Sequence, residues 1–269
     1  MHILFIGYGK TSQRVAKQLF QQGHQITTIS QSPKTDGYAT HLIQDVHQLN
    51  LDHIARIDWV YVLLSPQQST LEAYQHSYVD SVQPIIQALK QHPLQKIVVV
   101  SSTRVYGENK GARIDDDSAL NPNDPQGQLL LKMEQLYQPA YPTQSIIIRP
   151  TGIYGTSVAR MLRLAKSSQS YPDLHYSNRI HIEDLAGFLA HLLHVEHVKD
   201  AYIVSDNQPL ALHEIIQWFQ RQLGLAELLL LSEQCTGKRV YATRMQASGF
   251  KLKYADCFDT YKKLWTGLE

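Results

Sequence analysis

The chain has 269 residues, a formal net charge of +1, 43% hydrophobic residues and 18% charged residues. This balance is typical of a soluble globular protein and gives no sign of a nucleic-acid-binding surface or an acidic tail. Its two cysteines are too few for a disulfide framework, and no apolar run approaches the ~20 residues of a membrane span. We therefore expect a cytoplasmic protein, without a signal peptide, that is a monomer or homodimer and has no membrane or nucleic-acid partner.

Strands and helices are predicted to alternate along the chain. Residues 2–6 form a continuous apolar run, which is typical of a parallel strand buried on both faces. A helix with an apolar stripe is predicted over residues 11–22, ended by Gly23. Further strands are predicted at residues 25–30, 41–46, 58–65, 96–102, 145–149 and 201–205, and further helices at 71–91 and from Asp124 to near Tyr137.

This alternation predicts the fold class. Repeated βαβ units build a doubly wound parallel α/β sheet, the Rossmann fold. We assign residues 1–155 to this sheet domain and expect residues 179–206 to return to it. The less regular segments 156–178 and 207–269 predict a smaller C-terminal lobe.

A glycine turn follows the first strand and opens the first helix. Its sequence is GYGKTS, in which Gly7 allows a tight turn and Gly9 allows close approach of a pyrophosphate. Backbone N–H groups of Lys10 and Thr11 at the helix start favour a negative charge. The third glycine of the usual pattern is Ser12 here, a small residue that still permits close packing. The turn predicts dinucleotide binding.

The end of the second strand separates NAD from NADP. An acidic residue there binds the 2′-hydroxyl of the ribose, whereas its absence beside a basic group suits a 2′-phosphate. The chain has no acid at this point, where Ser30 and Gln31 are followed by Lys34. Arg14 also lies close in sequence to the glycine turn. We expect NADP(H) rather than NAD(H), against the alternative that these cations are ordinary solvated surface charges.

Three other patterns carry little weight. His191, His194 and His197 drift around the end of a predicted helix, where histidine also suits the dipole, so no metal site is predicted. The run of acids at 115–117 is interpreted as a solvated turn. Ser102 lacks the base and the turn of a nucleophilic serine, which leaves a strand-end hydrogen bond as the simpler reading.

Several motifs in fixed order give the chain a resemblance to a known family. They are the glycine turn, Asp45-Val46, VVVSSTRVYG at 98–107, IDDDSALNP at 114–122, IIIRPTGIYG at 146–155 and RIHIEDLAGFLAHLL at 179–193. In this order, and over nearly the whole length, they resemble the extended and atypical short-chain dehydrogenase/reductases of the NAD-dependent epimerase/dehydratase group.

The resemblance implies roles for individual residues. Ser102 matches the serine that hydrogen-bonds the reacting oxygen, and Tyr106 or Tyr154 is a candidate acid. Asp45 would contact the adenine end of the cofactor, and Arg149 would leave the sheet toward the nicotinamide. The other implied contacts are Val46, Leu64, Ser65 and Pro150 for the cofactor, and Thr103, Tyr154, Arg179 and His181 for the substrate.

The catalytic pair of the resembled family is a tyrosine followed four residues later by a lysine. A nearby ammonium lowers the pKa of such a phenol toward the working pH. If Gly127 and Glu134 are used as anchors, Gln126 and Leu130 occupy the two positions. If Lys132 is the anchor, Gln128 takes the place of the tyrosine. Both registers lack the tyrosine, and a glutamine amide cannot act as a general acid or base.

Two functions of different classes therefore remain open. The first is an NAD(P)-dependent oxidoreductase or epimerase that acts on a small carbonyl compound or a sugar nucleotide. The second is a non-catalytic NAD(P)-binding protein that senses redox state or supports a partner. The missing pair favours the second function, whereas the retained Ser102, Tyr106, Arg149 and His181 favour the first.

Overall fold

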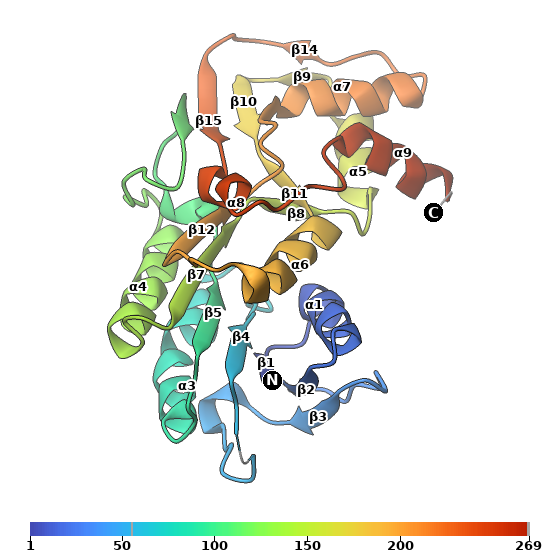
Figure 1. Cartoon of the computed structure of the whole chain (residues 1–269). Helices are drawn as coiled ribbons and strands as arrows, with labels where there is room; N and C mark the ends of the chain where they lie inside the picture. The colour runs from blue at the N-terminus through green and yellow to red at the C-terminus, as the bar shows by residue number, and fades with distance from the viewer. Residues whose placement is uncertain (55, 268–269) are drawn as a thin grey trace. The chain divides into compact units, whose positions relative to one another are not determined.

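The computed structural model describes residues 1–54 and 56–267, which form two compact units (Figure 1). The first unit comprises Met1–Gly107, Leu120–Arg149 and Ala186–Tyr202. The second comprises Glu108–Ala119, Pro150–Leu185 and Ile203–Glu269. This division differs from the expected one, because residues 108–119, 150–155, 179–185 and 203–206 belong to the second unit.

A seven-stranded sheet forms the frame of the first unit. The order is β12-β7-β5-β4-β1-β2-β3, and the described pairings between neighbours from β7 to β3 are parallel. Its central strands are buried on both faces, which explains their continuous apolar sequences. The strands are β1 (His2–Ile6), β2 (Gln25–Ser30), β3 (Thr40–Ile43), β4 (Trp59–Val62), β5 (Lys96–Val100), β7 (Ser145–Pro150) and β12 (Ala201–Val204).

Helices connect these strands, as the alternation predicted. On α1, Val15, Ala16 and Leu19 form the buried stripe, and Gly23 ends the helix with φ +85° and a hydrogen bond to the carbonyl of Phe20. Helix α4 begins after the side chain of Asp124 accepts a hydrogen bond from the backbone of Gly127. The helices are α1 (Lys10–Gln21), α3 (Val82–Leu89), α4 (Pro125–Ala140) and α6 (Ile182–His191), with the short turns η1 (Val46–Gln48), η3 (Thr103–Val105) and η4 (Leu192–His194).

The helix expected at residues 71–91 is interrupted. The structure has α2 (Leu71–Tyr74), then the π-helical segment η2 (Gln75–Asp80), then α3. Pro84 lies in the first turn of α3 and cannot donate a backbone hydrogen bond to the carbonyl of Asp80. The wider turn before it accommodates this loss, and π-helical segments of this kind occur often at functional sites.

The second unit is more regular than its sequence indicates. It has a four-stranded sheet in the order β13-β10-β15-β6 and two small two-stranded sheets, β11-β8 and β14-β9. Strands of two to six residues are too short to show a clear sequence period, so the sequence did not predict them. The strands are β6 (Lys110–Ile114), β8 (Gly152–Tyr154), β9 (Ser170–Tyr171), β10 (Leu174–Ser177), β11 (Arg179–His181), β13 (Leu210–Ala211), β14 (Leu229–Leu230) and β15 (Cys235–Val240).

Helices of the second unit enclose a separate apolar core. Met161, Ile215, Phe219 and Tyr261 are among its buried members, drawn from three helices that are far apart in the sequence. The helices are α5 (Ala159–Ser167), α7 (Leu212–Gln222), α8 (Thr243–Ala247) and α9 (Cys257–Thr266). Within the part of the chain that the structure describes, no helix has the length and apolar character to cross a membrane.

Candidate functional site

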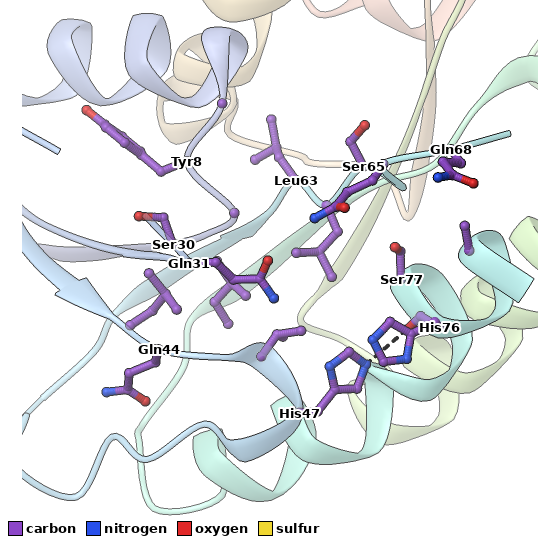
Figure 2. A pocket seen from close by; sticks show the side chains of 18 residues that line it. Tyr8, Ser30, Gln31, Gln44, His47, Leu63, Ser65, Gln68, His76 and Ser77 are labelled. Carbon is purple, nitrogen blue, oxygen red and sulfur yellow. Dashed lines mark hydrogen bonds between the residues drawn. The ribbon is translucent and has the colours of Figure 1, made fainter. Parts of the chain in front are cut away.

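A cavity of about 550 Å³ lies at the carboxyl edge of the large sheet, where the strand order reverses. The chain runs from β1 to β2 and β3 on one side, and from β4 to β5 and β7 on the other. Ligands of doubly wound sheets bind at this switch point. We call the space the switch-point cavity (Figure 2). It is lined by Ile6, Gly7, Tyr8, Gly9, Ile29, Ser30, Gln31, Gln44, Val46, His47, Leu63, Leu64, Ser65, Gln67, Gln68, Ala73, His76 and Ser77.

The glycine turn forms one edge of this cavity, and its two glycines have different reasons to be glycine. Gly7 has φ +88°, and a Cβ there would lie 2.3 Å from the carbonyl oxygen of Leu63. A Cβ on Gly9 would meet nothing within 4 Å, so the space beside the start of α1 is open to a ligand. An open cradle at a helix N-terminus fits the pyrophosphate of a dinucleotide.

The other predicted residues of the turn face elsewhere. The Ser12 side chain is buried and donates a hydrogen bond to the carbonyl of Gly7, 2.8 Å away, so it supports the turn from behind. Lys10 and Thr11 begin α1 but are not among the residues whose side chains line the cavity. Lys10 and Thr11 would therefore contribute to anion binding through their backbone N–H groups at the start of α1.

The end of β2 supplies neutral polar groups. Ser30 and Gln31 line the cavity, and the Ser30 hydroxyl donates to the carbonyl of Ser32 at 2.7 Å. Lys34 and Arg14 do not line it, and the Arg14 guanidinium donates to the carbonyl of Lys10 at 3.0 Å. Among the described lining residues there is no carboxylate that could bind a ribose 2′-hydroxyl, and no lysine or arginine.

Of the Asp45-Val46 pair, only Val46 lines the cavity. Asp45 instead caps η1, where its Oδ1 accepts from the backbone N–H of His47 and lies 2.9 Å from Nδ1 of the same ring. These hydrogen bonds lower the pKa of the Asp45 carboxyl. The predicted contact of Asp45 with the adenine end of a cofactor stays a prediction, and in this structure the Asp45 carboxylate contacts His47.

The loop after β4 and the helical segment that follows complete the lining. Leu64 and Ser65 lie in the cavity wall, as the sequence resemblance implied. Sequence reasoning missed Gln67, Gln68 and His76, which lie in the loop and in η2. The single signal for them was their position just beyond a strand end at the switch point.

Ser102, Thr103 and Gln126 lie outside the lining, in the first unit. Ser102 caps η3, where its hydroxyl oxygen accepts from the backbone N–H of Arg104 at 3.2 Å. The Arg104 guanidinium is held by Asp124 at 2.7 Å and donates to the Gln126 amide oxygen at 3.3 Å. The Gln126 amide in turn donates to the carbonyl of Ser69, in the loop that contributes Gln67 and Gln68 to the cavity.

Burial along α4 matches the register anchored on Gly127 and Glu134. Gly127, Leu130 and Glu134 are buried, whereas Gln128 and Lys132 are exposed. A Cβ on Gly127 would lie 2.8 Å from the carbonyl oxygen of Arg104. Leu130 is an apolar core residue, so this position offers no cation to a neighbouring hydroxyl or ribose.

Tyr106 and Arg149 belong to a buried ion-pair network. Arg149 binds the Glu134 carboxylate through Nη2 at 2.7 Å and Nε at 3.2 Å, and its Nη1 donates to the Tyr106 hydroxyl at 2.9 Å. All three side chains are at most about 5% exposed. Neither Arg149 nor Pro150 lines the cavity. The Arg149 guanidinium is thus held by Glu134 inside the first unit, and the Tyr106 hydroxyl accepts a hydrogen bond from it.

The predicted substrate residues Tyr154, Arg179 and His181 lie together in the second unit, on the paired strands β8 and β11. The His181 ring stacks on Tyr254 with 3.8 Å between centroids and meets Tyr154 edge-on at 5.2 Å. Burial raises the pKa of the Tyr154 phenol, which weakens its case as a general acid or base near neutral pH.

Arg179 is the most polar member of this group. It is 5% exposed, and Asp206 and Tyr261 lie close enough to interact electrostatically with its guanidinium. Burial raises the pKa of the Asp206 carboxyl to about 6. Arg179 is not among the lining residues of the switch-point cavity.

The acidic run at 115–117 is not the solvated turn that was expected. Asp116 is buried, and its carboxylate accepts from the backbone N–H of Ile203 and Arg244 and from the Thr243 hydroxyl. Only Asp117 is well exposed, in an ion pair with Arg244. No group of three or more potential metal ligands occurs among the described residues.

Comparison with known proteins agrees with this geometry. A family model described as the NAD dependent epimerase/dehydratase family matches residues 7–201. The protein YeeZ of Escherichia coli K12 is 23% identical over 94% of this chain and 96% of its own. A solved protein of Methylobacillus flagellatus, provisionally named as an NAD-dependent epimerase/dehydratase, is 31% identical with a TM-score of 0.83, covering 99% of this chain and 98% of that one. Human epimerase family protein SDR39U1, solved with NADPH, shares the fold at 20% identity, full coverage of both chains and a TM-score of 0.79.

Proposed function

Because the chain belongs to the NAD-dependent epimerase/dehydratase family, we propose that it binds a nicotinamide adenine dinucleotide in the switch-point cavity. The observation that carries this proposal is the open cradle at Gly9, beside the start of α1 and inside a cavity of about 550 Å³. A helix N-terminus with space beside it is the arrangement that holds a pyrophosphate.

The preferred cofactor in this proposal is NADP(H). Support comes from the end of β2, where Ser30 and Gln31 stand in place of the acidic residue that binds a ribose 2′-hydroxyl. Lys10 and Lys34 lie on the flanking segments, outside the lining, and are the lysines nearest in sequence to this edge of the cavity. We place the protein in the cytoplasm, as a monomer or homodimer whose partner is a small molecule.

The proposed reaction is hydride exchange with a small carbonyl or hydroxyl compound or with a sugar nucleotide. The cofactor would supply or accept the hydride. Ser102 would hydrogen-bond the reacting oxygen, since its hydroxyl already sits at the end of β5 and is only half-buried. Gln126 can hold that oxygen by an amide N–H but cannot exchange a proton with it.

The second candidate function is a non-catalytic sensor of the NADP(H) redox state. Three residues favour it: Gln126 and Leu130 cannot act as a Tyr-Lys pair, and the hydroxyl of Tyr106 is bound to Arg149 inside the core. A sensor needs only a difference in affinity between the oxidised and reduced cofactor.

A thermal-melt titration with NADP⁺, NADPH, NAD⁺ and NADH tests the shared claim. A ligand at 100 times its Kd adds about 2.7 kcal/mol, which raises the melting temperature of a chain of this size by about 5 to 10 °C. We expect a larger shift with the NADP pair, and a shift reduced to about half or less for the variant Gly9→Ala at the same concentrations. Absence of any shift with all four ligands would overturn the proposal.

Turnover then separates the two functions. In a stopped-flow experiment, the wild type is mixed with NADPH and a panel of aldehydes and ketones, and separately with NADP⁺ and a panel of alcohols and sugar nucleotides. Oxidation of NADPH by a carbonyl compound, or reduction of NADP⁺ by a hydroxyl compound, that slows at least tenfold in Ser102→Ala with unchanged cofactor affinity supports the enzyme. No change of cofactor redox state in either panel, together with a clear difference in affinity between NADPH and NADP⁺, supports the sensor.

A further inference from the structure

Two histidines from different segments meet at one end of the switch-point cavity. His47 lies in η1, just beyond β3, and His76 lies in the π-helical segment η2. Their rings stack with 3.9 Å between centroids and an angle of 17° between planes. Figure 2 shows the pair at the cavity wall, beside Ser77 and across from Gln31.

The ring of His47 lies between two protein acceptors. Its Nδ1 lies 2.9 Å from the Asp45 carboxylate, and its Nε2 lies 3.0 Å from the backbone carbonyl of His76. A carboxylate and a carbonyl can only accept, so an imidazole with one N–H donates to one of the two, according to its tautomer. The face of the His47 ring supports the His76 ring by stacking.

The ring of His76 is in the opposite situation. Its side chain is exposed, and its ring nitrogens make no hydrogen bond in the part of the chain that the structure describes. It is held by stacking on His47 and by the tie between its own carbonyl and the His47 ring. A ligand in the cavity can therefore stack on the His76 ring or form hydrogen bonds with its ring nitrogens.

The position of the pair indicates which part of a dinucleotide it would meet. The half of a doubly wound sheet made of β1, β2 and β3 holds the adenosine part, with the pyrophosphate at the glycine turn. His47 follows β3, and Gln44 and Val46 before it line the same cavity. The stacked pair thus lies at the adenosine end, away from the site of hydride transfer.

We propose that His76, seated on the fixed ring of His47, recognises the purine base of the bound dinucleotide by stacking and by hydrogen bonding. His47 acts as a positioning residue, and Asp45 acts through it. The π-helical turn has a place in this arrangement, since it carries both His76 and Ser77 on the cavity side. The inference rests on the proposed function, because it requires that a dinucleotide binds in this cavity.

The test compares NADPH with the reduced mononucleotide NMNH, which lacks the adenosine half. Affinities of the full-length protein for both are measured by isothermal titration calorimetry. In His76→Phe, which keeps a ring but loses the ring nitrogens, we expect NADPH to bind about 5- to 10-fold more weakly and NMNH to bind unchanged. His76→Gln, which keeps polar atoms without a ring, should also weaken NADPH selectively, by about 5-fold or more.

His47→Ala tests the positioning role. It keeps the His76 side chain but removes the ring on which His76 stacks. NADPH affinity should therefore fall by a similar factor, and NMNH affinity should stay unchanged. His53→Ala is the matched control, because His53 is an exposed histidine of the same unit that lies outside the cavity. Each variant is first melted without ligand to show an unchanged melting temperature.

The outcomes distinguish failure of the proposed function from failure of the inference about His76. If the wild type binds neither NADPH nor NADH, the proposed function fails and the inference fails with it. If the wild type binds NADPH and His76→Phe binds it equally well, only the inference is overturned. A parallel loss of NADPH and NMNH affinity also overturns it, because the effect would then not lie at the adenosine end.

Discussion

At the scale of single residues, the glycine turn joins two separate requirements. Gly7 is needed by the fold, since its φ of +88° and the nearby Leu63 carbonyl exclude a side chain. Gly9 is needed by a ligand, since nothing in the protein occupies the space that its Cβ would fill. The same three-residue stretch therefore shows how stability and binding can be separated by substitution.

Alanine at the two glycine positions should have different effects, one mainly on stability and the other mainly on binding. Gly7→Ala should lower the free energy of unfolding by about 2 kcal/mol or more, because it combines a strained backbone with a clash. Gly9→Ala should cost at most about 1 kcal/mol but weaken dinucleotide binding at least tenfold. Urea unfolding and calorimetric titration measure the two effects, and equal loss of stability in both variants would contradict this assignment.

Asp206 gives the second unit a pH-dependent stability. Burial raises the pKa of this carboxyl from 3.8 to about 6, so the folded state binds its proton more tightly than the unfolded state does. The resulting contribution to stability is fully present below about pH 4 and is lost as the pH rises through about 6. By linkage, the loss amounts to about 3 kcal/mol.

The comparison of wild type with Asp206→Asn isolates this effect from other titrating groups. Asparagine keeps an oxygen that can accept the hydrogen bond from the backbone N–H of Gln208, as Asp206 does at 2.9 Å. The variant should gain stability relative to the wild type as urea unfolding is moved from about pH 4 to pH 7. A constant difference across that range would show that the Asp206 carboxyl does not titrate with a raised pKa.

At the scale of elements, β6 and the loop after it tie distant parts of the chain into the second unit. β6 pairs with β15, more than 120 residues later, and the loop places Asp116 where three donors converge. One Asp116 oxygen accepts from the N–H of Ile203 and the other from Thr243 and Arg244. Within the acidic run, the Asp116 carboxylate therefore links this loop to Ile203 and to residues 243–244.

Asp116→Asn should destabilise the second unit by about 1 to 3 kcal/mol. One amide N–H₂ would face donors, so at least one buried hydrogen bond would be lost. Asp117→Asn is the matched control, because the Asp117 side chain is 80% exposed and its ion pair with Arg244 should contribute no more than about 1 kcal/mol. Thermal unfolding would refute the assignment if the neighbouring variants lost equal stability.

At the scale of the whole molecule, neither unit is a continuous piece of chain. The first unit requires Ala186–Tyr202, whose Phe188, Leu189 and Leu192 are completely buried. The Tyr61 hydroxyl donates to the Leu189 carbonyl at 2.9 Å, and the Ile147 N–H donates to the Asp200 carbonyl at 2.8 Å. The sheet that carries the switch-point cavity is therefore completed by residues from late in the sequence.

A chain that ends at residue 149 should not fold cooperatively. Each lost core side chain removes about 1.5 to 3 kcal/mol of burial free energy, and several together approach the whole stability of a domain. We expect this shortened chain to show no sharp thermal transition and no response to NADPH. A cooperative melt at a temperature near that of the full-length protein would mean that Ala186–Tyr202 contributes little to the first unit.

Features that depend on local chemistry could be predicted from the sequence alone. The apolar run at 2–6 and the β-forming residues at 25–30 matched β1 and β2, and the glycine turn, the buried stripe of α1 and the start of α4 followed from backbone and capping preferences. The order of strands and helices was sufficient for the fold class, because βαβ units have few ways to pack. Of the residues expected to contact a cofactor, Ser30, Gln31, Val46, Leu64 and Ser65 are among those that line the cavity.

The directions and partners of buried side chains depend instead on packing between distant segments. Arg149 binds Glu134, Asp116 is buried among donors from residues 203 and 243–244, and His76 stacks on a ring that lies 29 residues earlier. These contacts join segments that no local pattern connects. Buried charges must find partners wherever the fold supplies them, so such pairings are set by packing over the whole unit rather than by the residues on either side.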